Sequence, residues 1–212
     1  HMDEVGFMVN EGTDEGYVKF ACLGGIDPRV LCGRGVVLGD ESKKIKGVIA
    51  SKAIHLQSPE DRGAATPADK MYIDIGAADK EETLKYINPG DFGVFDSDFV
   101  IFGSGNGRIR SKAIDDRLGC AVIINVMRAL AAGDSPKPPL DVYFCFTVRE
   151  EIGFSGALTA ANEIRPDFSI VLESTAIADL PDVPAASRAA ALGEGGVVSL
   201  ADRSTIYDRE FV

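Results

Sequence analysis

The stretch Leu140-Asp-Val-Tyr-Phe-Cys-Phe-Thr-Val148 is an apolar run that is rich in aromatic and β-branched residues. A run of this kind is typical of a strand buried on both faces of a sheet. Helical patterns lie on either side of it, over 117–132 and over 156–164, and the first of them ends at Gly133. A second apolar run over 168–172 predicts another buried strand. This alternation of helix and strand predicts an α/β fold with a largely parallel sheet.

The part of the chain before about residue 113 has a different pattern. Short β-type runs are separated by Gly, Asp and Asn, and they lie at 16–22, 35–38, 45–50, 71–75 and 99–102. Short strands spaced in this way predict a small barrel or sandwich. One helix is expected within this part, because Asp79 is a suitable N-cap for residues 80–87 and the first turn is acidic.

The composition excludes several classes of function. The 212 residues include 22 Lys and Arg against 33 Asp and Glu, which gives a formal net charge of −11. A surface this acidic repels phosphate backbones and anionic membranes, and no apolar run is long enough to span a bilayer. We therefore expect neither nucleic acid nor membranes as partners. The four cysteines form no C-x-x-C pair and have apolar neighbours, which indicates small buried residues in a cytoplasmic protein.

Acidic residues follow or precede the elements of the predicted sheet. Asp115-Asp116 precedes the helix that starts at 117, Glu150-Glu151 follows the strand over 140–148, and Glu173 closes the strand over 168–172. Ligands of α/β sheets gather at the carboxyl ends of the strands. Converging carboxylates repel one another unless a cation neutralises them, so a divalent metal is the simplest explanation of this pattern.

Each of these residues also has a structural interpretation. Asp115 or Asp116 is suited to cap the following helix, and Glu150-Glu151 fits a solvated pair at a helix start. His1 is followed two residues later by Asp3, a pattern typical of a metal-binding imidazole oriented by a carboxylate. A His-Met start is equally typical of a cloning remnant.

Four longer motifs occur in order along the chain. They are His1-Met-Asp-Glu-Val-Gly-Phe-Met-Val9, Ser111-Lys-Ala-Ile-Asp-Asp-Arg-Leu-Gly119, Arg149-Glu-Glu-Ile-Gly-Phe-Ser-Gly-Ala157 and Leu172-Glu-Ser-Thr-Ala-Ile-Ala-Asp-Leu-Pro181. With these motifs the chain resembles the glutamyl aminopeptidase family of two-metal metallopeptidases. That family includes the tetrahedral (TET) and deblocking aminopeptidases, and its members are often mislabelled endoglucanase or cellulase M. The resemblance covers essentially all 212 residues.

The resemblance implies part of a zinc-peptidase (phosphorylase/hydrolase-like) α/β fold with an inserted, β-rich, barrel-like domain. Residues 1–7 and 104–212 would form the catalytic domain, and residues 8–103 the inserted domain that mediates dimerisation and assembly. Family members extend beyond both ends of this chain, so we expect the catalytic domain to be incomplete at both ends. The family also implies a homo-oligomer that builds from dimers up to a dodecamer.

The resemblance further implies two divalent metal ions, zinc or cobalt. His1, Asp115 and Glu173 would hold one metal, and Asp115 would bridge to a second metal that Glu151 also binds. The family supplies a further histidine to the second site, beyond the position that matches Val212. No histidine follows His55 in this chain, so the second site would lack that ligand.

Two more residues have implied catalytic roles. Glu150 would be the general base that takes a proton from the attacking water, and Asp3 would orient His1. The peptide bond between the two residues matching Asp115 and Asp116 is cis in the family. Adjacent Glu150 and Glu151 can divide their tasks only if the backbone turns there, since neighbours in a continuous strand point to opposite faces.

These residues together predict a metal-dependent aminopeptidase, a hydrolase that removes the N-terminal residue of peptide substrates. Because of the missing parts, we expect weak or no activity from these 212 residues alone. One alternative is a glycosidase that uses two carboxylates and no metal, although the chain contains no tryptophan to stack on sugars. The other is a non-catalytic assembly module.

Overall fold

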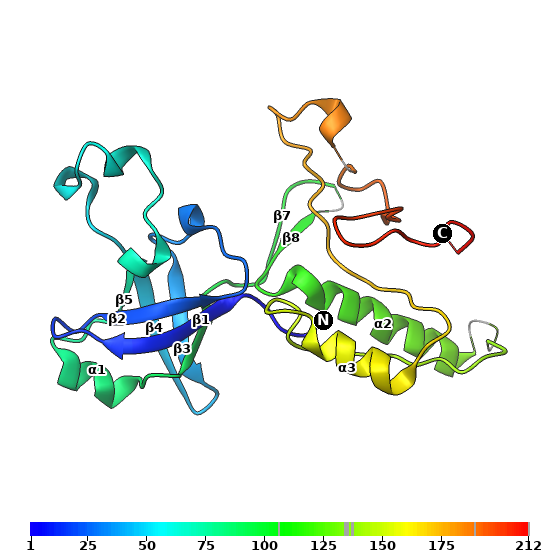
Figure 1. Cartoon of the computed structure of the whole chain (residues 1–212), viewed down its shortest axis with the longest axis horizontal. Coiled ribbons are helices and arrows are strands. Elements are labelled where there is room, and N and C mark those ends of the chain that lie inside the picture. Colours follow the sequence, from blue (N-terminus) through cyan, green and yellow to red (C-terminus); the bar gives the residue numbers. More distant parts are fainter. Residues whose placement is uncertain (106, 134–135, 137, 189, 212) are drawn as a thin grey trace. The chain divides into compact units, whose positions relative to one another are not determined.

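The chain forms two compact units, His1–Glu173 and Ser174–Val212. The computed structural model describes all residues except 106, 134–135, 137, 189 and 212. The first unit contains a β-barrel and two long helices, α2 and α3 (Figure 1). Within the described residues, no helix is both long and apolar enough to cross a membrane.

Six strands close into a barrel in the order β1-β2-β5-β4-β3-β6, and every neighbouring pair is antiparallel. The strands are β1 (Gly6–Gly12), β2 (Val18–Leu23), β3 (Gly35–Asp40), β4 (Lys43–Ala50), β5 (Tyr72–Asp74) and β6 (Phe92–Phe95). Closure leaves no unpaired edge within the barrel. The predicted barrel-like first half is therefore confirmed.

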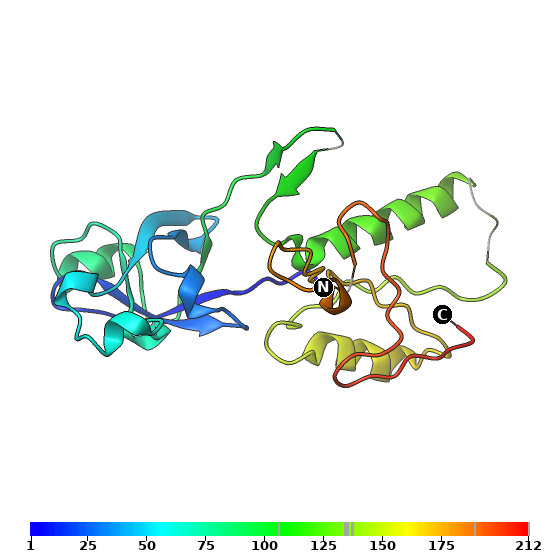
Figure 2. The ribbon, with the colours of Figure 1, turned by 90° about the horizontal axis from the view of Figure 1, so that it is seen from above.

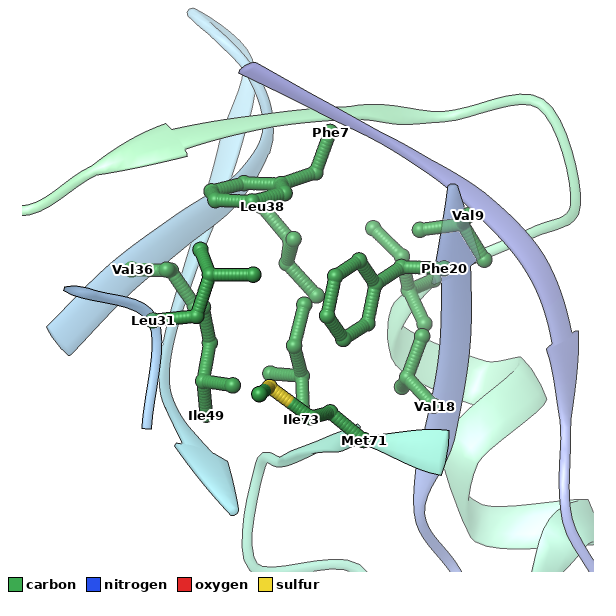
Figure 3. Close-up of a cluster of buried hydrophobic side chains, with 11 residues drawn as sticks. Phe7, Val9, Val18, Phe20, Leu31, Val36, Leu38, Ile49, Met71 and Ile73 are labelled. Carbon is green, nitrogen blue, oxygen red and sulfur yellow. The ribbon is translucent and has the colours of Figure 1, made fainter. Parts of the chain in front are cut away.

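The hydrophobic core of the protein lies inside this barrel (Figure 3). Phe7 contacts Phe20 and Phe95 edge to face, with ring centroids 5.3 and 5.0 Å apart. Inward-pointing side chains of the strands build most of this cluster, and three residues outside the strands, Leu31, Met71 and Ile87, complete it. The strand residues are Phe7, Val9, Val18, Phe20, Val36, Leu38, Ile49 and Ile73.

Helix α1 (Lys80–Tyr86) follows β5 and is capped as its sequence predicts. The Asp79 carboxylate accepts from the backbone N–H of Glu82 (2.8 Å), and the Glu82 carboxylate accepts from the N–H of Ala78 (2.7 Å). The buried Thr83 hydroxyl donates to the carbonyl of Gly16 (2.8 Å) and so fixes α1 to the turn before β2. Short 3-10 helices occupy other loops: Pro28–Val30, Ile54–Leu56, Asp61–Gly63 and Ala68–Lys70.

The β-type run at 99–102 does not join the barrel. It forms β7 (Val100–Phe102), which pairs only with β8 (Arg108–Arg110) in an antiparallel two-stranded sheet. The link between these strands includes residue 106, which lies outside the described residues.

Helices α2 (Ile114–Ala132) and α3 (Ser155–Ile164) confirm the two helices predicted in the second half. Asp115 and Asp116 have non-helical backbone angles, so the regular part of α2 begins at Arg117. Gly133 ends α2 in the left-handed conformation (φ 77°) that favours glycine. Figure 2 shows the two helices apart from each other, with extended chain between them.

The strands predicted over 140–148 and 168–172 are not formed, and this expectation was wrong. Both segments are irregular, and the described residues contain no parallel strand pair. An apolar run favours burial, but a strand also needs a neighbouring backbone to complete its hydrogen bonds, and no described strand lies beside these segments. None of their residues is buried and most are exposed, with Ile170 at 75%. The cysteines are not buried either, since Cys32 and Cys145 are exposed.

The second unit has little regular structure. It contains the 3-10 helix Ala185–Ser187 and one isolated antiparallel bridge between Ala201 and Ile206. Asp202 organises the turn at this bridge, since its carboxylate accepts from the N–H of Thr205 (2.8 Å) and the hydroxyl of Tyr207 (2.7 Å). These bonds, with the Tyr207 bond first, lower the pKa of Asp202 to about 2.

Candidate metal site

His1 lies just before the barrel, and its imidazole is almost fully buried, with 2% of the side chain exposed. Its Nε2 atom faces three carboxylates that come from distant parts of the sequence. The nearest oxygens are Asp115 Oδ1 at 3.4 Å, Glu150 Oε2 at 3.5 Å and Glu173 Oε1 at 3.8 Å. The fold therefore brings together residues that the sequence could only propose as a group.

The His1 Nε2 atom makes no hydrogen bond with any of these oxygens. Among the residues that the structure describes, it is the single buried side-chain nitrogen or oxygen without a hydrogen-bond partner. Buried polar atoms are nearly always paired, because an unpaired one loses its interaction with water and gains nothing. The atom that is left unpaired here is one that commonly binds metals.

Asp3 holds both the imidazole and the turn that carries the two glutamates. Its carboxylate accepts from the backbone N–H groups of Glu150 (3.2 Å) and Glu151 (3.3 Å). The other imidazole nitrogen, Nδ1, lies 3.1 Å from the carbonyl oxygen of Asp3 and 3.3 Å from its Oδ1. A proton on Nδ1 shared with these oxygens leaves the lone pair of Nε2 directed at the three carboxylates.

The backbone turns at Glu150, which is the condition that the sequence analysis set for different roles of Glu150 and Glu151. Arg149 adopts a positive φ of 61°, and the N–H of Gly153 donates to the carbonyl of Glu150 (3.0 Å). Gly156, in the first turn of α3, then packs so closely on Val148 that an added Cβ would lie 2.2 Å from its carbonyl oxygen. This close approach explains why glycine stands at that position.

The two neighbouring aspartates have different surroundings. The peptide bond between Asp115 and Asp116 is cis, as the resemblance implied. Asp115 faces His1 and is 64% exposed, whereas Asp116 is buried and accepts from the N–H of Gly119 (3.1 Å). The capping interpretation is thus correct for Asp116, while Asp115 lies in the candidate site.

Negative charge accumulates in the site. Burial raises the pKa of the Glu150 carboxyl above its usual range, and the charges of Asp115 and Asp3 raise it further. Burial also raises the pKa of Glu151, with the charges of Asp115 and Glu150 acting in the same direction. A bound cation would relieve this repulsion and favour the ionised forms.

The donor set and its distances fit a divalent metal. Two groups of ligand atoms each lie within 4.8 Å of one another: His1, Asp115 and Glu173, and His1, Glu150 and Glu151. Ligand atoms in a tetrahedral site with bonds of about 2.0–2.1 Å are separated by about 3.3–3.4 Å. The distance of 3.4 Å from His1 Nε2 to Asp115 Oδ1 matches this value. Imidazole with carboxylates suits zinc or its neighbours among the transition metals.

Other contacts of the site were not evident from the sequence. The loop after β2 reaches Glu151, because a Cβ added at Gly24 would lie 3.3 Å from the Cβ of Glu151 and 2.8 Å from Val5 Cγ1. Gly24 also has a φ of 86°. The paired glycines at 24 and 25 were the one signal of a close approach, and they did not reveal its partner.

Comparisons with known proteins identify the family to which the chain is similar. The family described as M42 glutamyl aminopeptidase matches residues 1–212. The TET aminopeptidase of the marine sediment archaeon Thaumarchaeota archaeon SCGC AB-539-E09 is 37% identical, with a TM-score of 0.85 over 92% of this chain and 54% of that one. The TET1 peptidase of Pyrococcus horikoshii is 33% identical, with a TM-score of 0.78 over 100% of this chain and 61% of that one.

A curated relative that aligns with this chain is also described as a glutamyl aminopeptidase. The glutamyl aminopeptidase of Lactococcus lactis subsp. cremoris is 30% identical over 186 residues, which are 84% of this chain and 50% of that protein. Two other curated relatives align over 210 and 214 residues, and the chain spans 58% of the length of each.

Proposed function

The chain belongs to the M42 glutamyl aminopeptidase family, and from this premise we propose that it carries the metal site of an aminopeptidase that removes the N-terminal residue of peptides. The observation that carries the proposal is the buried, unpaired Nε2 of His1, which faces Asp115, Glu150 and Glu173. A cation bound at this atom would pair with its lone pair and neutralise the surrounding carboxylates.

The proposed ligands divide into two sets that share Asp115. His1, Asp115 and Glu173 hold one divalent cation, zinc or cobalt, and their mutual proximity supports this set. Glu151 and Asp115 hold a second. When bound, the cations supply Lewis-acid chemistry, which makes water more acidic and a peptide carbonyl more electrophilic. Asp3 keeps the imidazole of His1 in place through its contacts with Nδ1.

Glu150 is the proposed general base. Its Oε2 atom lies 3.5 Å from His1 Nε2, at the edge of the proposed metal set, so it can accept a proton from the attacking water. It then delivers this proton to the leaving amine.

The barrel is proposed as an assembly domain inserted into the catalytic domain. The boundaries expected from the sequence are residues 8 and 103, and the barrel itself also includes Gly6 and Phe7 at the start of β1. Its strands pair only with one another and enclose their own core, which supports an independently folded insertion. The TET1 peptidase of Pyrococcus horikoshii can assemble into a tetrahedron or a large octahedral shell. By that likeness we propose that this protein also forms homo-oligomers in the cytoplasm.

Metal removal tests the proposed activity. Because the chain alone is expected to have weak or no activity, this test and the next use a form extended at both ends to the length of its relatives. The purified protein is treated with a chelator, and hydrolysis of a panel of aminoacyl substrates is measured with the metal content. We expect hydrolysis to be lost with the metal and restored by zinc or cobalt. Hydrolysis of a β-glucan that the chelator does not affect would instead support the glycosidase, and a metal content near zero in the untreated protein would support the assembly module.

The roles of the two adjacent glutamates are tested by a matched pair of variants. Glu150→Gln should keep both metals and lose hydrolysis, by about 100-fold or more, because the amide cannot accept the proton. Glu151→Gln should lose part of the metal content. If Glu150→Gln loses metal and Glu151→Gln does not, the two roles are assigned the wrong way round.

A further inference from the structure

Side chains at the start of α2 contact both the main-chain nitrogen and the carbonyl oxygen of His1. The nitrogen of His1, which in this chain is the terminal ammonium group, donates to Asp116 Oδ2 (2.8 Å), and the Cys120 thiol donates to the carbonyl oxygen of His1 (3.2 Å). Next to this contact, Arg117 Nε donates to the carbonyl oxygen of Met2 (3.1 Å). Asp115, which faces the imidazole, belongs to the same turn.

Gly119 makes these contacts possible. A Cβ added at Gly119 would lie 2.5 Å from Asp116 Oδ2 and 2.7 Å from Oδ1, well inside any real contact distance. Glycine therefore provides the space in which the buried carboxylate of Asp116 sits. Among the described residues after Gly93, Asp116 and Gly119 are the only buried ones.

We propose that Asp116, Gly119 and Cys120 form a clamp that positions His1 for metal binding. The clamp holds the imidazole on the turn that carries Asp115, so the distance of 3.4 Å between His1 Nε2 and Asp115 Oδ1 is set before a metal arrives. Asp116 is a positioning residue and not a ligand in this proposal, because its Oδ2 accepts from the terminal nitrogen of His1 and its Oδ1 from the backbone N–H of Gly119. This inference rests on the proposed metal site.

Asp116 does two things at once, and one substitution separates them. Its Oδ1 caps the regular part of α2 through the N–H of Gly119, and its Oδ2 binds the nitrogen of His1. Asparagine is an equally good N-cap, so Asp116→Asn keeps the bond to Gly119. In this variant the side-chain NH2 group faces the nitrogen of His1. Because both groups are hydrogen-bond donors, the bond between residue 116 and His1 is lost.

The experiment measures Zn²⁺ affinity by titration and the Co²⁺ absorption spectrum of the loaded protein. For Asp116→Asn we expect affinity lower by about 10- to 100-fold, the usual effect of disturbing a residue that orients a ligand, together with a changed Co²⁺ spectrum. Cys120→Ala should lower affinity less, and Cys120→Ser should restore it because the hydroxyl is again a donor. Thr83→Val removes a buried hydroxyl in the barrel and should leave affinity unchanged.

A second readout needs no metal. NMR of the metal-free protein should show weaker contacts between the His1 ring and Asp3 in Asp116→Asn, and unchanged contacts in Thr83→Val. Wild-type affinity, spectrum and ring contacts in Asp116→Asn would overturn the clamp. If the wild-type protein binds no metal while Asp116→Asn still frees the ring, the proposed function fails and the mechanical role of the clamp stands.

Discussion

The barrel and the region from α2 onward bury different kinds of side chain. All eleven residues of the apolar core lie between Phe7 and Ile87. After Gly93 the described residues bury only Asp116 and Gly119, while large apolar side chains on α2 and α3 are exposed. The barrel is thus stabilised by removal of apolar surface from water, whereas the candidate site is held by a few directed polar contacts.

This difference separates stability from function along one chain. Apolar packing contributes much of the folding free energy and tolerates the exchange of one apolar side chain for another of similar size. Each hydrogen bond at a site contributes less free energy but needs a defined geometry. Substitutions in the barrel should therefore change the free energy of unfolding with little direct effect on metal binding. Substitutions at the site should do the reverse.

The largest expected effect is on the free energy of unfolding, and it is seen by making the same Leu→Ala change in each of the two regions. Leu38 is fully buried in the barrel and Leu158 on α3 is 65% exposed. Leu38→Ala should lower the free energy of unfolding by about 2–5 kcal/mol, because it leaves a cavity. Leu158→Ala should change it by less than about 0.5 kcal/mol. Urea unfolding followed by circular dichroism measures both, and equal losses would break the comparison.

Gly24 is where the barrel and the site meet, so its substitution should affect both properties. Gly24→Ala should cost about 1–3 kcal/mol, because φ is 86° and the new Cβ would lie 2.8 Å from Val5 Cγ1. It should also weaken metal binding by displacing Glu151. Gly25→Ala is the matched control, since nothing lies within 4 Å of its Cβ. Calorimetry and metal titration on both variants test this, and identical behaviour would contradict it.

The helix caps provide a smaller test. Helix α1 has a side-chain cap from Asp79, whereas α3 begins after Phe154 and has no side-chain hydrogen bond at that position. Asp79→Ala should lower the free energy of unfolding by about 1 kcal/mol, and Asp79→Asn should restore most of it. Thermal unfolding measures the effect. A loss of metal affinity in Asp79→Ala would argue against the separation of the two regions.

The smallest expected effect is a change in the pKa of one carboxyl in the unit from Ser174 to Val212. Local polar contacts also hold the turn in this unit. Tyr207→Phe removes the main cause of the low pKa of Asp202, so that pKa should rise from about 2. A carboxyl with a lowered pKa stabilises the fold above its unfolded pKa of about 4 and loses that contribution as the pH falls through about 2. NMR titration measures the shift. The pKa of Asp27, which Arg29 lowers to about 2, should not change.

Much of the fold could be predicted from short-range patterns. The runs that became β2, β3, β4 and β5 were recognisable, and so were the cap of α1 and the glycine that ends α2. Each of these depends on neighbours within a few residues. The segments 140–148 and 168–172 were predicted wrongly because their apolar composition says nothing about a partner strand.

The sequence predicted which types of residue form the candidate site, but not how their side chains are arranged in space. Acidic pairs and one histidine stood out, and the resemblance to a family gave them roles that remain proposals. The opposite surroundings of Asp115 and Asp116 could not be read from two identical neighbours. The contact of Gly24 with Glu151 was equally hidden.

The sequence by itself determined the acidic character of the chain, its local helices and turns, and the motifs that mark its family. Only the tertiary structure decided that the Nε2 atom of His1 is buried without a hydrogen bond beside Asp115, Glu150 and Glu173, and that Asp116 contacts the terminal nitrogen of His1. The physical reason is the distance along the chain over which each kind of interaction acts. Propensities and caps act between neighbours, whereas burial, orientation and the close approach of like charges arise only when distant segments pack together.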